Sequence, residues 1–396
     1  MKLSAPSIMT NPASLPGTAL TRLTFPNVHA RRTRPRKAST SFVADVIARF
    51  NDWESWNGLI TYIMMIPTWL WYCLRSGSAW FFSTANPTLT FGGFTGDSKK
   101  EMYDQLPPGS FPKSFFAKSE FTFPQVKTML QRRAFKFPLE VKPDVGQKGY
   151  LFRKIYSESE LFCYHKKVKI NYIIQEFVDY PIEVSVFYYR VPNQKKGKIT
   201  GFVRKDYLQV VGNGRSTLRE LIKQHDGVHV FQEEILTKHA TRLNDIIPVN
   251  QVYVLSQGLN SNRGGKLVNL EHLKDEQLLK RFDELSLYTR YFYYGRFDIK
   301  CASIDDLKKG KNFTILDFNG AGAEPNHIYG NGYSFKEAIR TLVDHCTILF
   351  EISKHNRQLG IRRAKLWEGI MHMQKTNKHM AYLKKLDADP TLLSAR

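Results

Sequence analysis

The 396-residue sequence has little cysteine and lacks the short catalytic signatures that most readily reveal a function. Its four cysteines, Cys73, Cys163, Cys301 and Cys346, are far apart, and no Cys-x-x-Cys spacing occurs. This argues against a zinc site or a disulfide framework and favours a reducing compartment. The motifs His-Glu-x-x-His, Gly-x-Ser-x-Gly and Gly-x-x-x-x-Gly-Lys-Ser/Thr are also missing, so no zinc protease, serine hydrolase or P-loop is indicated.

Acidic residues are absent from the first part of the chain. Residues 1–44 contain none, and with scattered Pro, Ser and Thr they cannot bury enough apolar surface to fold. We therefore predict that residues 1–50 form a disordered basic segment. An organellar transit peptide, a tether to anionic lipid and an untranslated extension are alternatives. The basic residues of this stretch are Lys2, Arg22, Arg31, Arg32, Arg34, Arg36 and Lys37.

The whole chain is strongly basic. It has 58 Lys and Arg residues against 36 Asp and Glu residues, which gives a formal net charge of +22. Such an excess favours nucleic acid, an anionic membrane surface or phosphorylated ligands, whereas plain solubility is the alternative explanation. No aromatic–basic module is present, so we expect no nucleic-acid partner. A hydrophobic fraction of 42% suits a globular core, and the length allows two domains or one large one.

Long apolar runs are rare, and the clearest one is the uncharged stretch of residues 55–74. It ends at Arg75 and contains Pro67. About 20 apolar residues are needed to span a bilayer, so we predict a membrane-associating helix, embedded or half-inserted. A buried helix that packs on the catalytic domain is the alternative. The glycine-rich connector that follows completes this region, which covers residues 51–110. In it, Asp97 and Ser98 could cap a short helix whose backbone amides receive an anion, and a capped turn without a ligand is the alternative.

From about Phe111 onward, β-rich runs alternate with amphipathic segments. This pattern predicts an α+β fold with two α+β lobes. Strands are expected at residues 139–141, 150–155, 170–175, 183–190, 199–211, 251–254, 295–299 and 313–318, and helices at residues 218–224, 232–242 and 276–291.

Two groups of residues indicate a magnesium nucleotide. Lys142 leaves a strand just before the loop Gly146-Gln-Lys148-Gly149, where glycines let backbone amides approach phosphates and a lysine adds positive charge. Farther along, Asp298, Asp317 and Asn319 supply the carboxylate and amide oxygens that magnesium requires. An acid, one spacer and then Asn place both side chains on one face of a strand. Arg296 shares a face with Asp298 in the same way.

These pieces, in this order, resemble the ATP-grasp superfamily over residues 111–330, and in particular its carboxylate–amine ligase branch, which includes glutathione synthetases, cyanophycin synthetases and D-alanine–D-alanine ligases. The resemblance implies two α+β lobes that sandwich ATP. It implies that backbone groups of Glu176, Phe177 and Val178 bind the adenine edge and that Glu183 binds the ribose. It further implies that Arg296 steadies the acyl phosphate and the tetrahedral intermediate.

Two further segments, residues 211–222 and 259–265, look like insertions found in the peptide-forming branch. Lys205 and Arg263 are candidate contacts for phosphate or carboxylate, with an ordinary surface charge as the alternative for each. Gly264 belongs to the same candidate substrate loop as Arg263. In one respect the chain departs from the usual plan. The stretch from Arg75 to Ser110 is too short for the full α/β domain that generally precedes the grasp, which leaves the substrate open and makes a membrane-proximal acceptor worth considering.

Residues 331–396 are predicted to form C-terminal helices. The spacing of Phe335, Ile339, Leu342, Val343, Cys346 and Phe350 suits one amphipathic helix. A second, basic helix is expected over residues 361–386, with Trp367, Ile370 and Met373 facing inward. We assign no role to His345 or His355.

We therefore expect an ATP- and Mg²⁺-dependent carboxylate–amine ligase, with Mn²⁺ as an alternative ion, that works through an acyl phosphate. Lys142, Lys148 and the glycine flap would neutralise the triphosphate. The expected partners are ATP, carboxylate and amine substrates and a membrane surface, in the cytoplasm at the inner face of the membrane. A kinase for a non-carboxylate acceptor and a non-catalytic, ATP-binding membrane adaptor are the alternatives.

Overall fold

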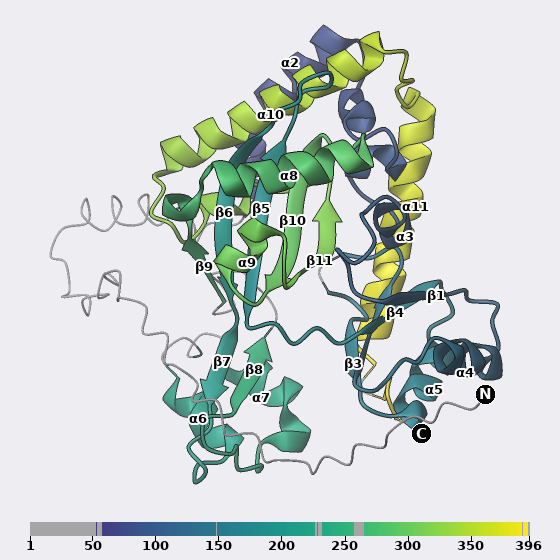
Figure 1. Cartoon of the computed structure of the whole chain (residues 1–396), viewed down its shortest axis with the longest axis vertical. Coiled ribbons are helices and arrows are strands. Elements are labelled where there is room, and N and C mark those ends of the chain that lie inside the picture. Colours follow the sequence, from purple (N-terminus) through teal and green to yellow (C-terminus); the bar gives the residue numbers. More distant parts are fainter. Residues whose placement is uncertain are drawn as a thin grey trace, which may run out of the picture. The chain divides into compact units, whose positions relative to one another are not determined.

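The computed structural model describes residues 53, 58–147, 149–225, 228, 232–256, 265–389 and 391–394 (Figure 1). The expected basic segment at residues 1–50 lies outside the described residues. So do three of the expected site residues, Lys148, Arg263 and Gly264.

The larger of the sheets has five strands in the order β11-β10-β5-β6-β9, and all neighbours are antiparallel. One face packs on helix α8, which Asp275 caps and which contributes Leu278, Phe282 and Leu285 to the core. The other face packs on helix α10 through Phe187. Burial on both faces explains why β5 is apolar almost throughout. The elements are β5 (Ile182–Tyr189), β6 (Lys198–Asp206), β9 (Lys266–Asn269), β10 (Tyr294–Cys301), β11 (Phe313–Asn319), α8 (Glu276–Thr289), α9 (Ile304–Lys309) and α10 (Phe335–Gln358).

A second, four-stranded antiparallel sheet has the order β1-β4-β2-β3 and its own core. Two helices cover it through Val126, Leu130, Leu161 and Tyr164. The expectation of a mixed α+β fold is therefore confirmed. The strand expected from residue 150 begins only at Arg153. The elements are β1 (Ser114–Ala117), α4 (Phe123–Arg132), β2 (Leu139–Pro143), β3 (Arg153–Ile155), α5 (Glu158–Lys167) and β4 (Tyr172–Glu176).

A small two-stranded sheet forms a third unit with its own apolar cluster. The single strand expected over residues 199–211 is in fact two strands, because β6 pairs with β5 and β9 whereas the next strand turns away at Tyr207 to pair with β8. The elements are β7 (Leu208–Val211), α6 (Leu218–Gln224), α7 (Gln232–Lys238), η4 (Ala240–Arg242) and β8 (Val252–Ser256).

The apolar run near the N-terminus forms helix α2 (Gly58–Ser76), which packs lengthwise on α10. The Tyr72 ring stacks on Phe350 with 4.6 Å between centroids, and its hydroxyl lies 2.8 Å from Thr347 Oγ1. Among the described helices, none is both long and apolar enough to cross a membrane. Packing on the rest of the protein, the alternative expected from the sequence, thus describes one face of α2. The short elements that follow are η2 (Phe81–Thr84), η3 (Thr90–Gly93) and α3 (Lys99–Tyr103).

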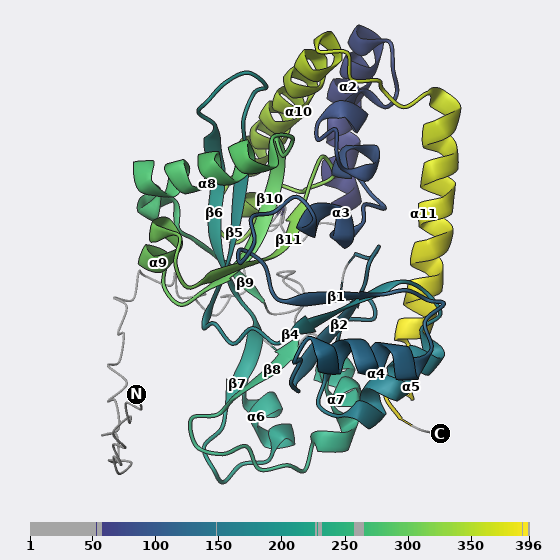
Figure 2. The same cartoon turned by 45° about the vertical axis from the view of Figure 1, so that its right-hand side comes forward.

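Helix α11 (Leu366–Asp387) connects the region of α2 to the four-stranded sheet (Figure 2). Near its start, Trp80 Nε1 donates to the Leu366 carbonyl at 3.0 Å, and near its end Leu383 enters the core of the four-stranded sheet. The helix begins at residue 366 and not at 361. The expectation that Trp367 faces inward is wrong, because this side chain is exposed, whereas the buried positions are elsewhere on the helix. Two further short helices are η6 (Glu271–Leu273) and η7 (Asn326–Ile328).

Candidate functional site

Lys142 joins the two larger sheets. It lies on β2 of the four-stranded sheet, and its ammonium donates to the Leu316 carbonyl of β11 at 3.0 Å and to the Tyr103 hydroxyl at 3.1 Å. Burial lowers the pKa of Lys142 below its ordinary value, while the nearby carboxylates of Asp317 and Glu140 act in the opposite direction. A cation from one sheet is therefore held against the other sheet, next to carboxylates.

The acidic and amide residues expected to bind metal lie on the paired strands β10 and β11. The register places Asp298 opposite Asp317 and Arg296 opposite Asn319. Residues two apart on a strand share a face, so the four side chains form one patch. Asn319 Nδ2 lies 3.3 Å from Asp298 Oδ2, and Arg296 Nε lies 3.3 Å from Asp298 Oδ1. The structure thus brings this expected set together.

Lys205 lies between two buried carboxylates, those of Glu183 and Asp298. From β6 its ammonium lies 3.2 Å from Glu183 on β5 and 3.0 Å from Asp298 on β10. The side chains of Lys205, Glu183 and Asp298 are only 7, 9 and 11% exposed. Ser185 also donates to Asp298. Burial alone would raise the pKa of Asp298, but Lys205 and Arg296 outweigh it and hold this pKa well below its usual range.

Lys99 is a site residue that the sequence did not reveal. Its ammonium lies 3.0 and 3.2 Å from the two carboxylate oxygens of Asp317. Burial raises the pKa of Asp317, but Lys99 and Lys142 outweigh it, so the carboxyl stays below its usual range. Each of the two central carboxylates therefore has its own lysine. Lys99 precedes residue 111, where the ATP-grasp resemblance begins.

Glycines place Lys99 beside Asp317. The segment before α3 runs along the chain after β11, with the Ala321 amide 3.1 Å from the Gly92 carbonyl and the Gly322 amide 3.0 Å from the Gly93 carbonyl. A β-carbon on Gly93, which has φ +73°, would lie 2.9 Å from the α-carbon of Gly320. This close approach needs glycine in both segments, at Gly93 and at Gly320. The glycine-rich connector was the signal in the sequence that could have pointed to Lys99.

Side chains of the protein itself occupy the N-terminus of helix α3 in that connector. Ser98 caps α3 by accepting from the amides of Lys100 and Glu101. The Lys100 amide also donates to Asp144 Oδ1 at 2.9 Å, and the Ser98 hydroxyl contacts the same carboxylate at 2.8 Å. The Asp144 carboxylate, which lies just before the glycine loop, therefore occupies the position that the sequence suggested for an anion.

The segment expected to bind the adenine edge follows β4 and is surrounded by lysines. Lys300 donates to the Val178 carbonyl at 2.9 Å. The Phe177 ring has the ammonium of Lys154 at 3.3 Å from its centroid and that of Lys300 at 5.4 Å. Glu176 at the strand end is exposed and lies 3.5 Å from the ammonium of a neighbouring lysine. These contacts hold the connection between the two sheets in a defined conformation.

Helix α11 holds the loop that contains Gly146 and Gly149. His379 Nε2 lies 2.9 Å from the Val145 carbonyl on one side of the loop. On the other side, Asp387 Oδ1 accepts from the Leu151 amide at 2.8 Å. The glycine loop is therefore fixed at both ends by the C-terminal helix.

The metal-binding set can be tested on its donor chemistry. No group of three or more His, Cys, Asp and Glu side chains that could hold an ion occurs within the described ranges. Asp298, Asp317 and Asn319 offer two carboxylates and one amide. Magnesium is commonly held by one or two carboxylates together with substrate phosphates, so this set fits that ion. Its negative charge is matched by the ammonium groups of Lys99 and Lys205.

Comparison with known proteins gives a match by structure alone. No family model and no curated protein matches the sequence. A D-alanine–D-alanine ligase from Bacillus anthracis is 12% identical, with 66% of this chain and 67% of that chain covered and a TM-score of 0.36. The VanG D-Ala:D-Ser ligase from Enterococcus faecalis is 13% identical, with 68% and 62% covered and a TM-score of 0.32.

A bifunctional glutathione synthetase from Pasteurella multocida is 12% identical, with 62% of this chain but 35% of that chain covered and a TM-score of 0.32. The ATP-grasp ligase PsnB in complex with a minimal precursor is 13% identical, with 64% and 60% covered and a TM-score of 0.32. All four TM-scores are below 0.5.

Proposed function

We propose that the protein is an ATP-dependent carboxylate–amine ligase of the ATP-grasp kind. One observation carries the proposal. Lys142 of the four-stranded sheet meets β11 of the five-stranded sheet, beside the patch formed by Asp298, Asp317 and Asn319. A polyphosphate bound there would contact cations from one sheet and acidic metal ligands from the other. This is the combination that phosphoryl transfer requires.

In this proposal the nucleotide is bound by residues from both sheets. Lys142 and the loop from Gly146 to Gly149 neutralise the phosphates. Backbone groups of residues 176–178 bind the adenine edge, and Glu183 binds the ribose. Lys205, now paired with Glu183 and Asp298, adds positive charge beside the phosphates.

Asp298, Asp317 and Asn319 would hold magnesium, which supplies charge neutralisation on the phosphate oxygens. The carboxylates are kept ionised for this task, because their lysine partners hold the pKa of both Asp298 and Asp317 below the usual range. An ionised carboxylate is the form that binds a cation. Lys99 and Lys205 therefore maintain the acidic patch until substrate binds.

The reaction has two steps. A substrate carboxylate oxygen attacks the γ-phosphorus, the bond from that phosphorus to the bridging oxygen breaks, and ADP leaves. The amine then attacks the acyl carbon, the carbon–oxygen bond to phosphate breaks, and the amine loses a proton to give the amide. Arg296, which now contacts Asp298 and the Glu324 carbonyl at 3.0 Å, stabilises the oxyanion. Positioning and electrostatics carry the reaction without a protein nucleophile.

Steady-state turnover tests the proposal. ADP release is measured with a panel of carboxylates and amines, and hydroxylamine traps the acyl phosphate. Asp317→Ala and Asn319→Ala are each expected to reduce ADP release by about 10²-fold or more while keeping the wild-type circular dichroism spectrum. Asp305→Ala, an exposed acid on α9, is the matched control and is expected to be fully active.

Near-normal turnover in both site variants would refute the metal assignment. ADP release without any trapped hydroxamate would instead indicate a kinase that acts on a non-carboxylate acceptor.

A further inference from the structure

Helix α2 has an apolar face that nothing among the described residues covers. Its large outward side chains recur at the spacing of a single helix face. Leu74 is 78% exposed, Trp71 59% and Leu70 55%. We call this set the α2 outer face, and it consists of Ile63, Met64, Ile66, Leu70, Trp71 and Leu74.

This exposure is not the result of a helix that fails to pack. The opposite face of α2 is well packed, with the Trp69 ring 4.9 Å from Phe81 and Tyr72 stacked on Phe350. The helix is therefore apolar on both sides, which is unusual for a surface helix. Contiguous exposed apolar patches of this kind mark sites of interaction with proteins or membranes.

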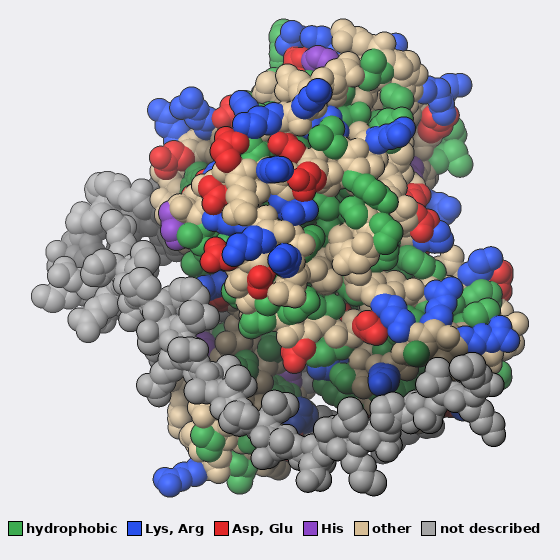
Figure 3. Space-filling view, in the orientation of Figure 1, with side chains coloured by type: hydrophobic (Ala, Val, Ile, Leu, Met, Phe, Trp, Pro, Cys, Tyr) green, Lys and Arg blue, Asp and Glu red, His purple; other side chains and the backbone are tan. Residues whose placement is uncertain are grey.

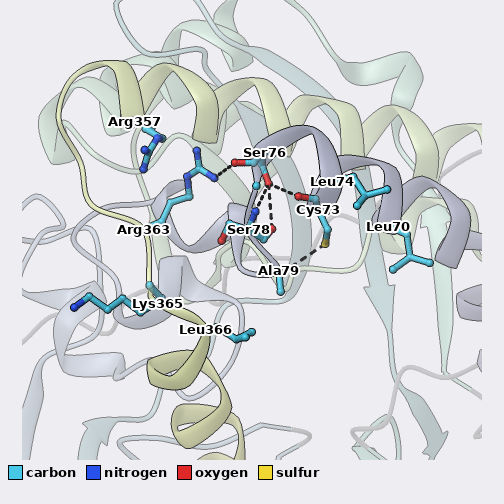
Figure 4. A pocket seen from close by; sticks show the side chains of 12 residues that line it. Leu70, Cys73, Leu74, Ser76, Ser78, Ala79, Arg357, Arg363, Lys365 and Leu366 are labelled. Atoms are coloured by element: carbon cyan, nitrogen blue, oxygen red, sulfur yellow. Dashed lines mark hydrogen bonds between the residues drawn. The ribbon is translucent and has the colours of Figure 1, made fainter.

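A cavity of about 730 Å³ lies at the C-terminal end of the α2 outer face (Figure 4). One side is apolar, with Leu70 and Leu74 from α2 and Leu366 from the start of α11. The other side carries three cations, which are Arg357 in the last turn of α10 and Arg363 and Lys365 on the connection from α10 to α11.

Within the described residues none of these three cations forms an ion pair, although the Glu368 carboxylate, which pairs with Arg362, also attracts Lys365. The Arg363 guanidinium donates to the Ser76 carbonyl, which is an uncharged acceptor. Burial, together with the like charge of Arg357, lowers the pKa of Arg363. Cations that outnumber the carboxylates near them, beside an apolar face, are complementary to an anionic group attached to an apolar body.

We propose that the α2 outer face and the adjoining cavity dock the protein on an anionic phospholipid bilayer. The apolar side chains enter the interfacial layer, and headgroup phosphates bind Arg357, Arg363 and Lys365. The helix lies in the plane of the membrane surface and does not cross it. This differs from the embedded or half-inserted helix expected from the sequence, and it adds α10 and α11 residues to the contact.

Charge decides in favour of lipid over a second copy of the chain. A self-contact across the α2 outer face would bring two sets of unpaired cations toward one another. A chain of net charge +22, whose residues 1–44 hold no acid, is repelled by itself and attracted to an anionic surface. Exposed Trp and Leu on one helix face with Arg and Lys beside them is the composition of an interfacial anchor.

Vesicle sedimentation of the full chain tests the proposal. The vesicles contain phosphatidylcholine alone or phosphatidylcholine with phosphatidylserine, and nucleotide is left out so that failure here says nothing about the ligase proposal. Wild-type protein is expected to sediment with the anionic vesicles and to do so less as salt is added. The triple variant Leu70→Gln/Trp71→Gln/Leu74→Gln is expected to bind at least about tenfold more weakly.

Removing the positive charges that line the cavity tests the electrostatic contribution to vesicle binding. Arg357→Gln/Arg363→Gln/Lys365→Gln is expected to weaken partitioning by about fivefold per charge removed. The matched control, Lys195→Gln/Lys198→Gln/Lys336→Gln, removes the same charge from exposed positions elsewhere and is expected to bind like the wild type.

The control for the apolar triple variant is Ile246→Gln/Val249→Gln/Val252→Gln. It changes exposed apolar residues of the two-stranded unit and is expected to leave vesicle binding unchanged.

Three results would overturn the proposal. They are no sedimentation with anionic vesicles, equal losses in the site and control variants, or a wild-type dimer that the apolar triple converts to a monomer without any vesicle binding.

Discussion

Replacing Lys205 by methionine removes the cation that forms ion pairs with both Glu183 and Asp298. In the wild type the ammonium lies 3.2 Å from Glu183 and 3.0 Å from Asp298, and all three side chains are about nine-tenths buried. Methionine fills nearly the same volume, so the substitution leaves packing in place and takes away charge. What remains is a pair of buried carboxylates on adjacent strands.

The cost follows from the loss of that counter-charge. Removing one partner of a buried ion pair destabilises a protein by about 3–5 kcal/mol, because the other charge is left uncompensated. Arg296, 3.3 Å from Asp298, still offsets part of the charge. We therefore expect a loss at the lower end of that range, about 3 kcal/mol.

The loss should depend on pH in a defined direction. In the wild type the pKa of Asp298 is below its ordinary value, so this group contributes stability that is present above a pH of about 4 and is lost as pH falls further. Without Lys205 the pKa of Asp298 is higher than in the wild type, because one of the groups that lower it is gone, and the destabilisation is relieved once the carboxyl takes up a proton. The difference between variant and wild type is therefore largest at neutral pH and shrinks on acidification.

Denaturant unfolding followed by circular dichroism measures this difference. Lys196→Met is the matched control, because Lys196 makes a 2.8 Å pair with Glu276 in which both side chains are more than two-thirds exposed. Exposed pairs of this kind contribute at most about 1 kcal/mol. Equal, small losses in the two variants, or a loss for Lys205→Met that does not change with pH, would refute the burial argument.

Three further outcomes are expected. Burial lowers the pKa of His327 to about 4 and that of His345 to about 3, so both side chains stay neutral in the folded protein. The free energy of unfolding should therefore fall by about 4 kcal/mol between pH 7 and pH 5, because the histidines of the unfolded chain take up protons. His345→Phe should roughly halve that slope in a pH series of unfolding curves. Gly322→Ala places a β-carbon 1.9 Å from a carbonyl oxygen and should destabilise the protein by about 3 kcal/mol or more in thermal unfolding. Gly109→Ala meets open space, so it should cost only the roughly 1 to 2 kcal/mol of a left-handed residue with positive φ. Asp387→Ala removes a charged acceptor at the end of the glycine loop, so amide exchange there should rise about 10- to 100-fold by mass spectrometry, with no rise in the two-stranded unit as the control.

Much of the β structure could be predicted from local pattern. The strands that contain Glu183, Asp298 and Asp317 lie close to the expected positions, because their apolar runs are bounded by turn residues. The acid–spacer–Asn spacing of Asp317 and Asn319 correctly placed both on one face, since strand periodicity is a local property.

The remainder depended on contacts between distant segments. Lys99 meets Asp317 across 218 positions of sequence, and no local pattern reveals that pairing. The sequence could not show that α10 covers one face of the predicted membrane-associating helix α2, because the contacting residues Tyr72 and Thr347 are 275 positions apart. Trp367 was expected inside because helical spacing identifies a face but not which neighbour covers it.

The most direct test of the account is the binding of MgATP by titration calorimetry. One nucleotide is proposed to bind between the two larger sheets. We therefore expect saturable one-to-one binding by the wild type and loss of that binding in both Lys142→Met and Asp317→Ala, which alter opposite sheets. Wild-type affinity in either variant, or no binding of MgATP by the folded wild-type protein, would contradict this placement.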